Sequence, residues 1–216
     1  MFITFEGING SGKSTQAKLL FERLQKQGKD VILTKEPGGL GNFPMKEFCT
    51  EIRRLICQTK NISKITEMFL LFAARKEHTD KLILPALKAG KIVICDRYID
   101  STYAYQCCDN WDDMDFVSLL NKEIGGLMPD ITFFMDISVE LSEYRLAPLI
   151  LGSIEHGNTA GYKKYDELAT EHMQKIANTY RFLAKKNSDR IKTIDGSLSI
   201  EKIATIIDKE LSQKFS

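Results

Sequence analysis

Five short runs of apolar residues alternate along the chain with longer segments whose apolar positions recur every three or four residues. The short runs are rich in β-branched and aromatic residues, which is typical of strands that are buried on both faces. They occupy residues 2–5, 31–34, 91–95, 131–136 and 191–194. Because predicted helices separate these runs, the pattern predicts an α/β fold, a three-layer α/β/α sandwich around a five-stranded parallel sheet.

The longer segments have the periodicity of amphipathic helices. Predicted helices cover residues 13–27, 45–57, 64–89 (one or two helices), 98–106, 116–124, 138–146, 162–186 and 199–214. Pro85 lies inside the third of them and is expected to kink or restart it. Residues 147–161 lack clean periodicity and contain several turn-forming residues. We interpret them as a mobile lid within a single domain that comprises residues 1–216.

The composition is that of an ordinary globular protein, with 43% hydrophobic and 27% charged residues in a chain of 216. The net charge of +1 provides no basic field for a nucleic-acid partner. The longest apolar run, residues 68–74, is too short to span a bilayer, and the early first strand leaves no room for a signal peptide. We therefore expect a cytoplasmic protein without a nucleic-acid or membrane partner.

The five cysteines have an irregular spacing that does not form a disulfide framework. Cys107 and Cys108 are adjacent, but neither a C-x-x-C pair nor a histidine pair accompanies them in the sequence. The spacing therefore predicts reduced thiols and no zinc site.

A phosphate-binding motif directly follows the first predicted strand. Residues 7–14 read GINGSGKS and match the pattern G-x-x-x-x-G-K-[ST]. Glycines in such a loop allow successive backbone N–H groups to face a phosphate, and the following helix adds its positive dipole end. The pattern predicts that Lys13 reaches the β- and γ-phosphates and that Ser14 binds Mg²⁺. The residues expected to bind ATP are Gly7, Ile8, Asn9, Gly10, Ser11, Gly12, Lys13, Ser14 and Thr15.

A second group of polar residues follows the third predicted strand, in the segment DRYIDSTYAYQ. Ligands of open parallel sheets bind at the carboxyl ends of the strands, where Asp96 and Arg97 lie. Arg97 offers a bidentate clamp for an acceptor phosphate, while Asp96 either organises Mg²⁺ through water or orients Arg97. The spacing of Ser101, Tyr105 and Gln106 presents them to one cleft, where the last two are suited to read a sugar and a base. An Asp–Arg pair that only fastens a helix to the sheet is the simpler alternative.

Taken together, these segments resemble bacterial-type thymidylate kinases. The resemblance rests on FITFEG with its phosphate loop, on EPGG, on E-x-x-x-x-x-A-A-R and on DRY-x-x-S-x-x-AYQ. It extends from residue 2 to about residue 137 and continues weakly to the end. It implies a P-loop NTP hydrolase fold, the use of ATP and Mg²⁺, transfer of the γ-phosphoryl group of ATP to dTMP to form ADP and dTDP, and a homodimer.

The resemblance also implies roles for residues on the acceptor side. Arg97 would hold the dTMP phosphate, and Tyr105 would block a 2′-hydroxyl group. The ring that stacks on thymine in the family falls at Leu71 here; we choose the neighbouring Phe72 for that role, with a core role equally open. The substrate-binding residues so implied are Glu36, Pro37, Arg53, Phe72, Arg75, Arg97, Ser101, Tyr105 and Gln106.

Two departures from the family pattern affect the expected chemistry. Asn9 stands where the family usually has an acid. Relatives without an arginine in the phosphate loop supply catalytic arginines from the lid, but residues 147–161 contain none. Arg145 precedes this segment and two lysines, Lys163 and Lys164, follow it, so we expect one of them to serve or turnover to be slow. The expected catalytic residues are Lys13, Asp96, Arg97 and Arg145, with Ser14 and Asp96 (through water) expected at the metal.

Two other functions agree with parts of this pattern. A deoxynucleoside kinase has a similar phosphate loop, but it phosphorylates a neutral hydroxyl group and would leave Arg75 and Arg97 with less to bind. A regulator that binds a nucleotide without catalysis would agree with Asn9 and with the arginine-poor lid. Turnover with dTMP, turnover with thymidine, or neither would separate the three functions.

Overall fold

A single sheet of five parallel strands forms the centre of the computed structural model, which describes residues 1–59, 61–155 and 169–215. The strand order is β2-β3-β1-β4-β5. The strands are β1 (Phe2–Glu6), β2 (Val31–Lys35), β3 (Ile92–Asp96), β4 (Ile131–Asp136) and β5 (Ile191–Asp195). The predicted strands and their parallel arrangement are therefore confirmed.

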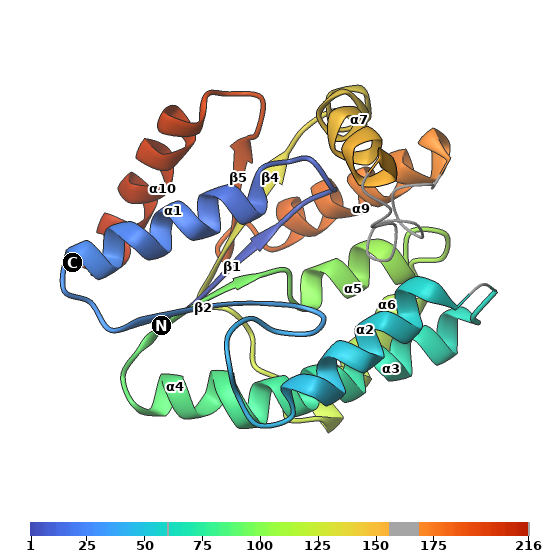
Figure 1. Cartoon of the computed structure of the whole chain (residues 1–216), viewed down its shortest axis with the longest axis horizontal. Coiled ribbons are helices and arrows are strands. Elements are labelled where there is room, and N and C mark those ends of the chain that lie inside the picture. The colour runs from blue at the N-terminus through green and yellow to red at the C-terminus, as the bar shows by residue number, and fades with distance from the viewer. Residues whose placement is uncertain (60, 156–168, 216) are drawn as a thin grey trace.

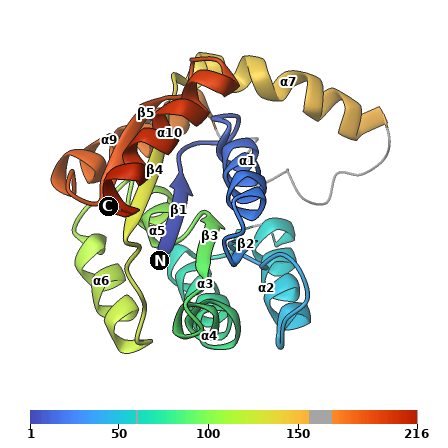
Figure 2. The same cartoon turned by 90° about the vertical axis from the view of Figure 1, so that its left-hand side faces the viewer.

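Helices cover both faces of this sheet, because its strands are apolar on both sides (Figures 1 and 2). On one face, α1 (Lys13–Lys26) and α10 (Ile200–Phe215) pack Leu20 and Ile207 against Ile3 and Phe5 of β1. On the other face, α5 (Ile99–Gln106) and α9 (Thr170–Lys186) pack next to each other, and Phe134 of β4 lies in the core cluster that they share. The three-layer prediction is thus confirmed.

The predicted helix over residues 64–89 is divided into three consecutive pieces. The pieces are α3 (Lys64–His78), the π-helical segment η1 (Thr79–Ile83) and α4 (Leu84–Lys88). Pro85 lies in the first turn of α4, where a missing N–H costs nothing, so the expected restart at this proline is confirmed. The remaining helices of this half are α2 (Lys46–Gln58) and α6 (Asp113–Glu123). No helix in the described ranges is long and apolar enough to cross a membrane.

The helix that was predicted to end near Leu146 continues into the segment expected to be a lid. Helix α7 extends from Val139 to Glu155 and includes Pro148. Proline in a helix interior removes one backbone hydrogen bond and often kinks or ends the helix. In this chain α7 continues past Pro148. Residues 156–161 of the expected lid, and residues 162–168 of the predicted helix that follows it, lie outside the described residues.

The order of the strands determines where functional side chains meet. β1 and β3 are direct neighbours, and Phe5 of β1 is paired with Asp96 of β3. The carboxyl ends of these two strands therefore bring the loop after Glu6 next to Asp96 and Arg97. This edge of the sheet is also where ligands bind in open α/β folds.

Candidate active site

The loop between β1 and α1 has a backbone that two glycines make possible. Gly7 has φ 138°, and a Cβ atom there would lie 2.6 Å from the carbonyl oxygen of Met135. Gly12 precedes the first residue of α1 with φ 92°, in the left-handed region. The loop thus reaches the helix N-terminus in a tight curve, and backbone N–H groups and the helix dipole face the same side.

Two polar side chains at the start of α1, Lys13 and Ser14, form hydrogen bonds at the carboxyl end of the sheet. The Lys13 amine, which is 6% exposed, donates to the carbonyl oxygen of Ile8 at 2.7 Å. The Ser14 hydroxyl donates to Oδ2 of Asp96. The other carboxylate oxygen of Asp96, Oδ1, is buried and has no hydrogen-bond partner. Buried polar atoms are normally satisfied, so this oxygen remains able to accept a hydrogen bond from bound water or to bind a cation.

The guanidinium group of Arg97 joins three parts of the fold. It donates to Oδ1 of Asn9 in the loop at 2.5 Å, to Ser101 at 3.1 Å and Tyr105 at 3.2 Å on α5, and to Tyr180 on α9 at 3.2 Å. The residue itself has φ 70°, and its backbone N–H donates to Phe5 of β1. The turn after β3 therefore directs this cation toward the phosphate loop.

A second arginine of the site lies on α3 and is buried. Arg75 donates to Oε2 of Glu36 at 2.8 Å and to Thr102 at 2.9 Å, while His78 lies 3.2 Å from the other carboxylate oxygen of Glu36. Burial raises the pKa of Glu36, but the charge of Arg75 and the hydrogen bond with His78 outweigh it, so the net shift is downward and the carboxylate stays ionised. One terminal nitrogen of Arg75, Nη1, is buried without a hydrogen-bond partner.

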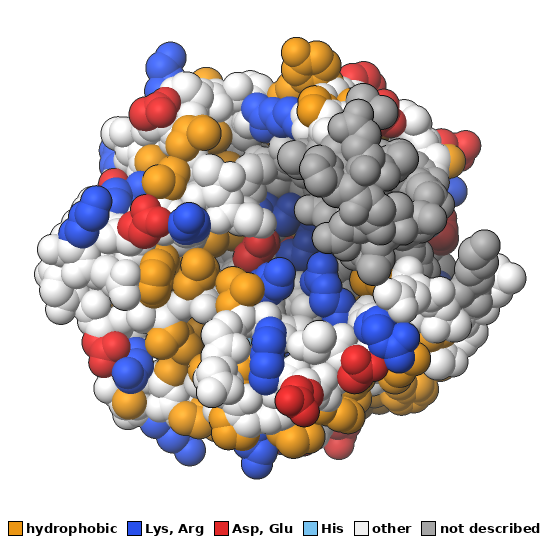
Figure 3. Space-filling view, viewed as in Figure 1, with side chains coloured by type: hydrophobic (Ala, Val, Ile, Leu, Met, Phe, Trp, Pro, Cys, Tyr) orange, Lys and Arg blue, Asp and Glu red, His pale blue; other side chains and the backbone are white. Residues whose placement is uncertain are grey.

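These groups line one cleft with a volume of about 740 Å³. Figure 3 shows Lys and Arg side chains gathered in the hollow of this face. The expected site residues that line it are Asn9, Gly10, Gly12, Lys13, Ser14, Thr15, Glu36, Pro37, Arg53, Arg75, Asp96, Arg97, Ser101, Tyr105, Gln106 and Arg145. Gly7, Ile8 and Ser11 belong to the loop without lining the cleft. A phosphate-binding loop thus lines the same cleft as two arginines, the buried Arg75 and the partly buried Arg97.

Comparison with known proteins agrees with this geometry. The sequence profile of the family described as "Thymidylate kinase" matches residues 5–207. The chain is 34% identical to the thymidylate kinase of Acinetobacter baumannii (strain AYE) over 94% of this chain and 96% of that protein. It is 40% identical to the thymidylate kinase of Wolbachia pipientis wMel over 91% of each. The chain belongs to the thymidylate kinase family.

The fold agrees with a solved thymidylate kinase as well. The crystal structure of the enzyme from Ehrlichia chaffeensis superimposes with a TM-score of 0.74 at 32% identity, over 98% of both chains. Kinases of this family use ATP, so the protein is an ATP-dependent phosphotransferase whose family activity is the phosphorylation of dTMP.

Phe72 is the one expected substrate residue that the structure removes from the cleft. Its side chain is 3% exposed and packs in the core with Met68, Val93 and Tyr98. The cleft is lined instead by the preceding residue, Leu71. Successive residues of an α-helix point in directions about 100° apart. Leu71 therefore faces the cleft while Phe72 faces the core. Of the two roles considered for Phe72, the core role is the one that fits.

Glu67 is a buried acid on α3 for which the sequence suggested no role. Its carboxylate accepts a hydrogen bond of 2.9 Å from Nε2 of Gln106. The amide oxygen of Gln106 is buried without a hydrogen-bond partner. Glu67 therefore fixes which end of the amide is available to a ligand. The sequence motif contained this acid, but only the packing of α3 against α5 shows its partner.

Glu6 is the second acid that sequence analysis missed, although a glutamate at the end of an apolar strand is itself a signal. It is fully buried and accepts hydrogen bonds from the Tyr98 N–H at 2.7 Å, Ser101 at 2.6 Å and Tyr180 at 3.1 Å. Burial, and then the nearby Asp100, raise the pKa of Glu6 to about 7. Ser101 and Tyr180 also bond Arg97, so Glu6 supports the residues that hold this cation.

Replacing Glu6 with Gln removes the ionisable group but keeps an acceptor for the Tyr98 N–H. The pKa of Glu6 rises from 4.5 to about 7 on folding, so its contribution to stability is complete below pH 4.5 and is lost as the pH rises through 7. Relative to wild type, the free energy of unfolding of E6Q should rise by up to about 3 kcal/mol across this window. Urea denaturation at a series of pH values measures the difference.

The exposed Glu47 on α2 provides a matched control for this experiment. Glu47→Gln should unfold with the same pH dependence as wild type. If the E6Q and wild-type curves stay parallel between pH 4.5 and 7, the raised pKa of Glu6 is wrong.

Proposed function

We propose that this cleft binds ATP and dTMP side by side. Its residues align the two nucleotides so that the γ-phosphoryl group of ATP is transferred to dTMP. The observation that carries the proposal is that the phosphate loop, the buried Arg75 and the partly buried Arg97 line the same cleft. Both substrates carry phosphate groups, so both sides of such a cleft need cations or N–H donors. A deoxynucleoside kinase would present a neutral hydroxyl group to these arginines, and a site for two anions fits the geometry better.

On the donor side, residues 7–15 would bind the ATP phosphates through backbone N–H groups and the N-terminus of α1. Lys13 would contact the β- and γ-phosphates after its amine leaves the Ile8 carbonyl oxygen. Arg145 on α7 donates to the carbonyl oxygen of Gly10 at 3.3 Å and to that of Gly196 at 3.0 Å. These contacts support a role for Arg145 as the arginine that neutralises charge on the donor side.

On the acceptor side, Arg97 would hold the dTMP phosphate in a bidentate contact. Nη1 of Arg75, which has no hydrogen-bond partner, supports a second contact to the same nucleotide. Arg53 donates to the Pro37 carbonyl oxygen at 3.1 Å and so ties α2 to the segment after β2. The remaining residues proposed around the deoxyribose and thymine are Glu36, Pro37, Ser101, Tyr105 and Gln106.

The residues near Asp96 also fit Mg²⁺. This ion prefers oxygen ligands and retains several waters, and Ser14 and Asp96 supply a hydroxyl group and a carboxylate with one unpartnered oxygen. Ser14 would bind the ion directly and Asp96 through water. When bound with ATP, Mg²⁺ neutralises charge on the β- and γ-phosphates.

The transfer itself requires alignment more than acid–base chemistry. The attacking group is a phosphate oxygen of dTMP, which is largely dianionic at pH 7 and needs no base to remove a proton. Arg97 would hold this oxygen in line with the γ-phosphorus, and Lys13 would stabilise the group in transit. The enzyme's residues thus supply position and positive charge, and no covalent intermediate is needed.

An ADP-release assay with Mg·ATP tests the acceptor. We expect turnover with dTMP, none with thymidine or without acceptor, and loss of turnover when Mg²⁺ is chelated. Arg97→Lys keeps the charge but loses the planar fork, so kcat/KM for dTMP should fall by about 100-fold or more. Arg54→Ala, on the exposed side of α2, should match wild type. Equal turnover with thymidine would overturn the proposal.

Arg145→Ala tests the donor side. Loss of one charged donor to a transferring phosphoryl group typically lowers kcat by about 100-fold. We expect that loss with dTMP held at saturation, and Arg145→Lys should recover part of the activity. Lys18→Ala, an exposed cation on α1, controls for the change in charge. A full kcat for Arg145→Ala would exclude Arg145 from catalysis.

We further infer that the protein forms a homodimer through α3 and α6. Ile65 (46% exposed), Phe69 (53%) and Leu119 (52%) are apolar side chains on the surface of these helices, and the Phe69 ring packs on Phe116 at 6.2 Å. Exposed apolar patches of this kind are typical of protein interfaces. The family resemblance supports a homodimer.

Phe69→Lys places a charge in this patch and should convert the dimer to a monomer. Sedimentation equilibrium should give twice the chain mass of 24.6 kDa for wild type and the chain mass for the variant. Tyr144→Lys, at a 79% exposed position on α7, is the control and should remain dimeric. A monomeric wild type at micromolar concentration would refute the inference.

We also propose a cytoplasmic location. Family membership supports it, as do the five cysteines, all of which are free thiols. Cell fractionation followed by detection of the chain tests it, and recovery in a membrane or secreted fraction would contradict it.

A further inference from the structure

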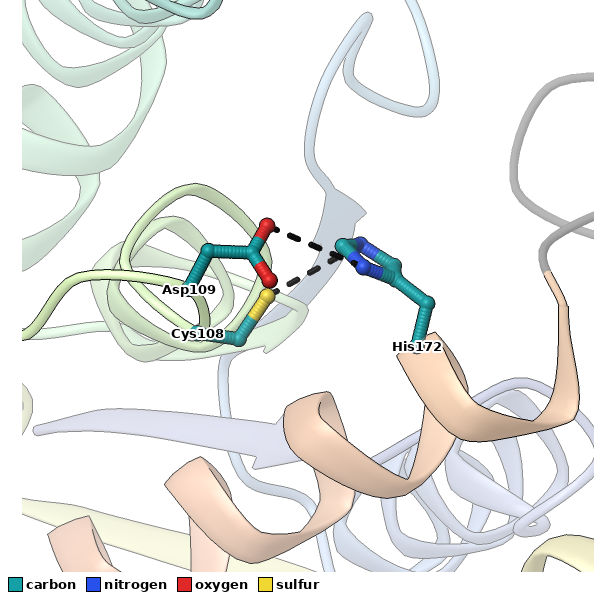
Figure 4. A group of neighbouring side chains, drawn as sticks. All are labelled: Cys108, Asp109 and His172. Carbon is teal, nitrogen blue, oxygen red and sulfur yellow. Dashed lines mark hydrogen bonds and ion pairs between the residues drawn. The ribbon is translucent and has the colours of Figure 1, made fainter.

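Three metal-ligating side chains meet on the surface between α5 and α9, outside the cleft. Cys108 and Asp109 follow the C-terminus of α5, and His172 lies in the first turn of α9 (Figure 4). The Cys108 sulfur lies 3.8 Å from Nε2 of His172, and Oδ2 of Asp109 lies 3.7 Å from Nδ1. One ligand atom from each residue can be chosen so that all three lie within 4.8 Å of one another.

The sequence spacing had predicted no zinc site, because Cys108 and His172 are 64 positions apart. Packing of α5 against α9 in the folded chain removes this separation. The prediction considered only ligands that are close in sequence, whereas two of these side chains come from the end of one helix and the third from the start of another.

We propose that Cys108, Asp109 and His172 form a binding site for a zinc-class divalent cation, with water as the fourth ligand. Zinc takes thiolate, imidazole and carboxylate ligands at about 2.0–2.3 Å in a tetrahedron. Ligand atoms of one tetrahedron are then about 3.3–3.8 Å apart. One ring nitrogen of His172 would be the ligand, and side-chain rotation would bring the three ligand atoms, now within 4.8 Å of one another, to these spacings. Thiolate and imidazole also select zinc over Mg²⁺ and Ca²⁺, which prefer oxygen.

The exposure of these side chains agrees with reversible binding. Cys108 is 9% exposed, whereas the side chains of Asp109 and His172 are 53% and 32% exposed, so the cation reaches the site from solvent. Before binding, the Cys108 thiol donates to the Tyr105 carbonyl oxygen at 3.6 Å. When the metal binds, a bond from the metal to sulfur replaces the S–H bond, and the thiol proton is released to solvent.

Lys175 limits the affinity of the site. Its amine lies 3.2 Å from Oδ1 of Asp109, on the carboxylate that also faces His172, and 3.9 Å from Glu171. A cation in the site would lie near this ammonium group and would compete with it for Asp109. Removal of Lys175 should therefore strengthen metal binding, an effect opposite to that of removing a ligand.

Occupancy of the site would fasten two helices that carry acceptor-side residues. Tyr105 is on α5 three residues before Cys108, and Tyr180 is on α9 eight residues after His172. A cation bound to the folded state alone stabilises it in proportion to the logarithm of metal concentration over Kd. The site is thus a surface clamp between α5 and α9.

Binding is tested with Zn²⁺ and Co²⁺ on the metal-stripped full-length enzyme. Competition with a chromophoric chelator gives the Zn²⁺ Kd, and Co²⁺ should give a sulfur-to-cobalt charge-transfer absorption that depends on Cys108. Cys108→Ser should abolish that absorption. His172 is partly exposed, so truncation to Ala should be tolerated. Loss of a residue that only supports a metal ligand typically raises the Kd by about 10–100-fold, and His172→Ala, which removes a ligand, should raise it by more.

Two surface variants complete the experiment. Lys175→Ala should lower the Kd several-fold, while Asp112→Asn, an exposed acid on the same connection, should leave it unchanged. Circular dichroism confirms that each variant is folded. If wild type lacks the Co²⁺ absorption, or if His172→Ala binds Zn²⁺ as tightly as wild type, the proposal is wrong.

Discussion

The arrangement of the whole site depends on how a positive charge, that of Arg97, is held next to the phosphate loop. Among the described residues its hydrogen-bond partners are all neutral: the amide of Asn9 and the hydroxyl groups of Ser101, Tyr105 and Tyr180. Neutral dipoles fix the direction of the guanidinium group without cancelling its charge. The carboxylates that balance the charge are placed at a distance or bonded elsewhere, as Glu6 is to Tyr98 and Asp96 is to Ser14.

This view gives a physical meaning to the asparagine in the phosphate loop. A carboxylate at position 9 would form an ion pair with Arg97 and compete with an incoming phosphate. Asn9 accepts the same hydrogen bond at 2.5 Å with no formal charge. The charge of Arg75, in contrast, is neutralised directly by an ion pair with Glu36. Only one nitrogen of its guanidinium group, Nη1, has no hydrogen-bond partner. The two arginines of the cleft therefore differ in how much of their charge is available to a ligand.

Much of this arrangement was predictable because it follows from local pattern. Runs of apolar residues such as 131–136 specify buried strands, and the glycines around Lys13 specify the loop. The failures concern contacts between distant segments. Periodicity in the stretch FLLFAAR could not decide whether residue 71 or 72 faces the sheet, since both are apolar. The turn-forming residues after Leu146 obscured the helical periodicity, although α7 continues through Pro148 to Glu155. The partners of Glu6, Gln106 and Cys108 depend on how α5 packs against its neighbours, which no local pattern records.

The carboxyl group of Glu6 also links two kinds of ligand. It accepts hydrogen bonds from Ser101 and Tyr180, whose hydroxyl groups also contact Arg97. With a pKa of about 7, it is only partly ionised at neutral pH. An anion that binds to Arg97 adds negative charge near this group and makes its protonated form more favourable. Anion binding and proton uptake are then thermodynamically coupled, so each increases the affinity for the other. The cleft would take up a fraction of a proton with its phosphate, and the measured heat of binding would depend on the ionisation enthalpy of the buffer.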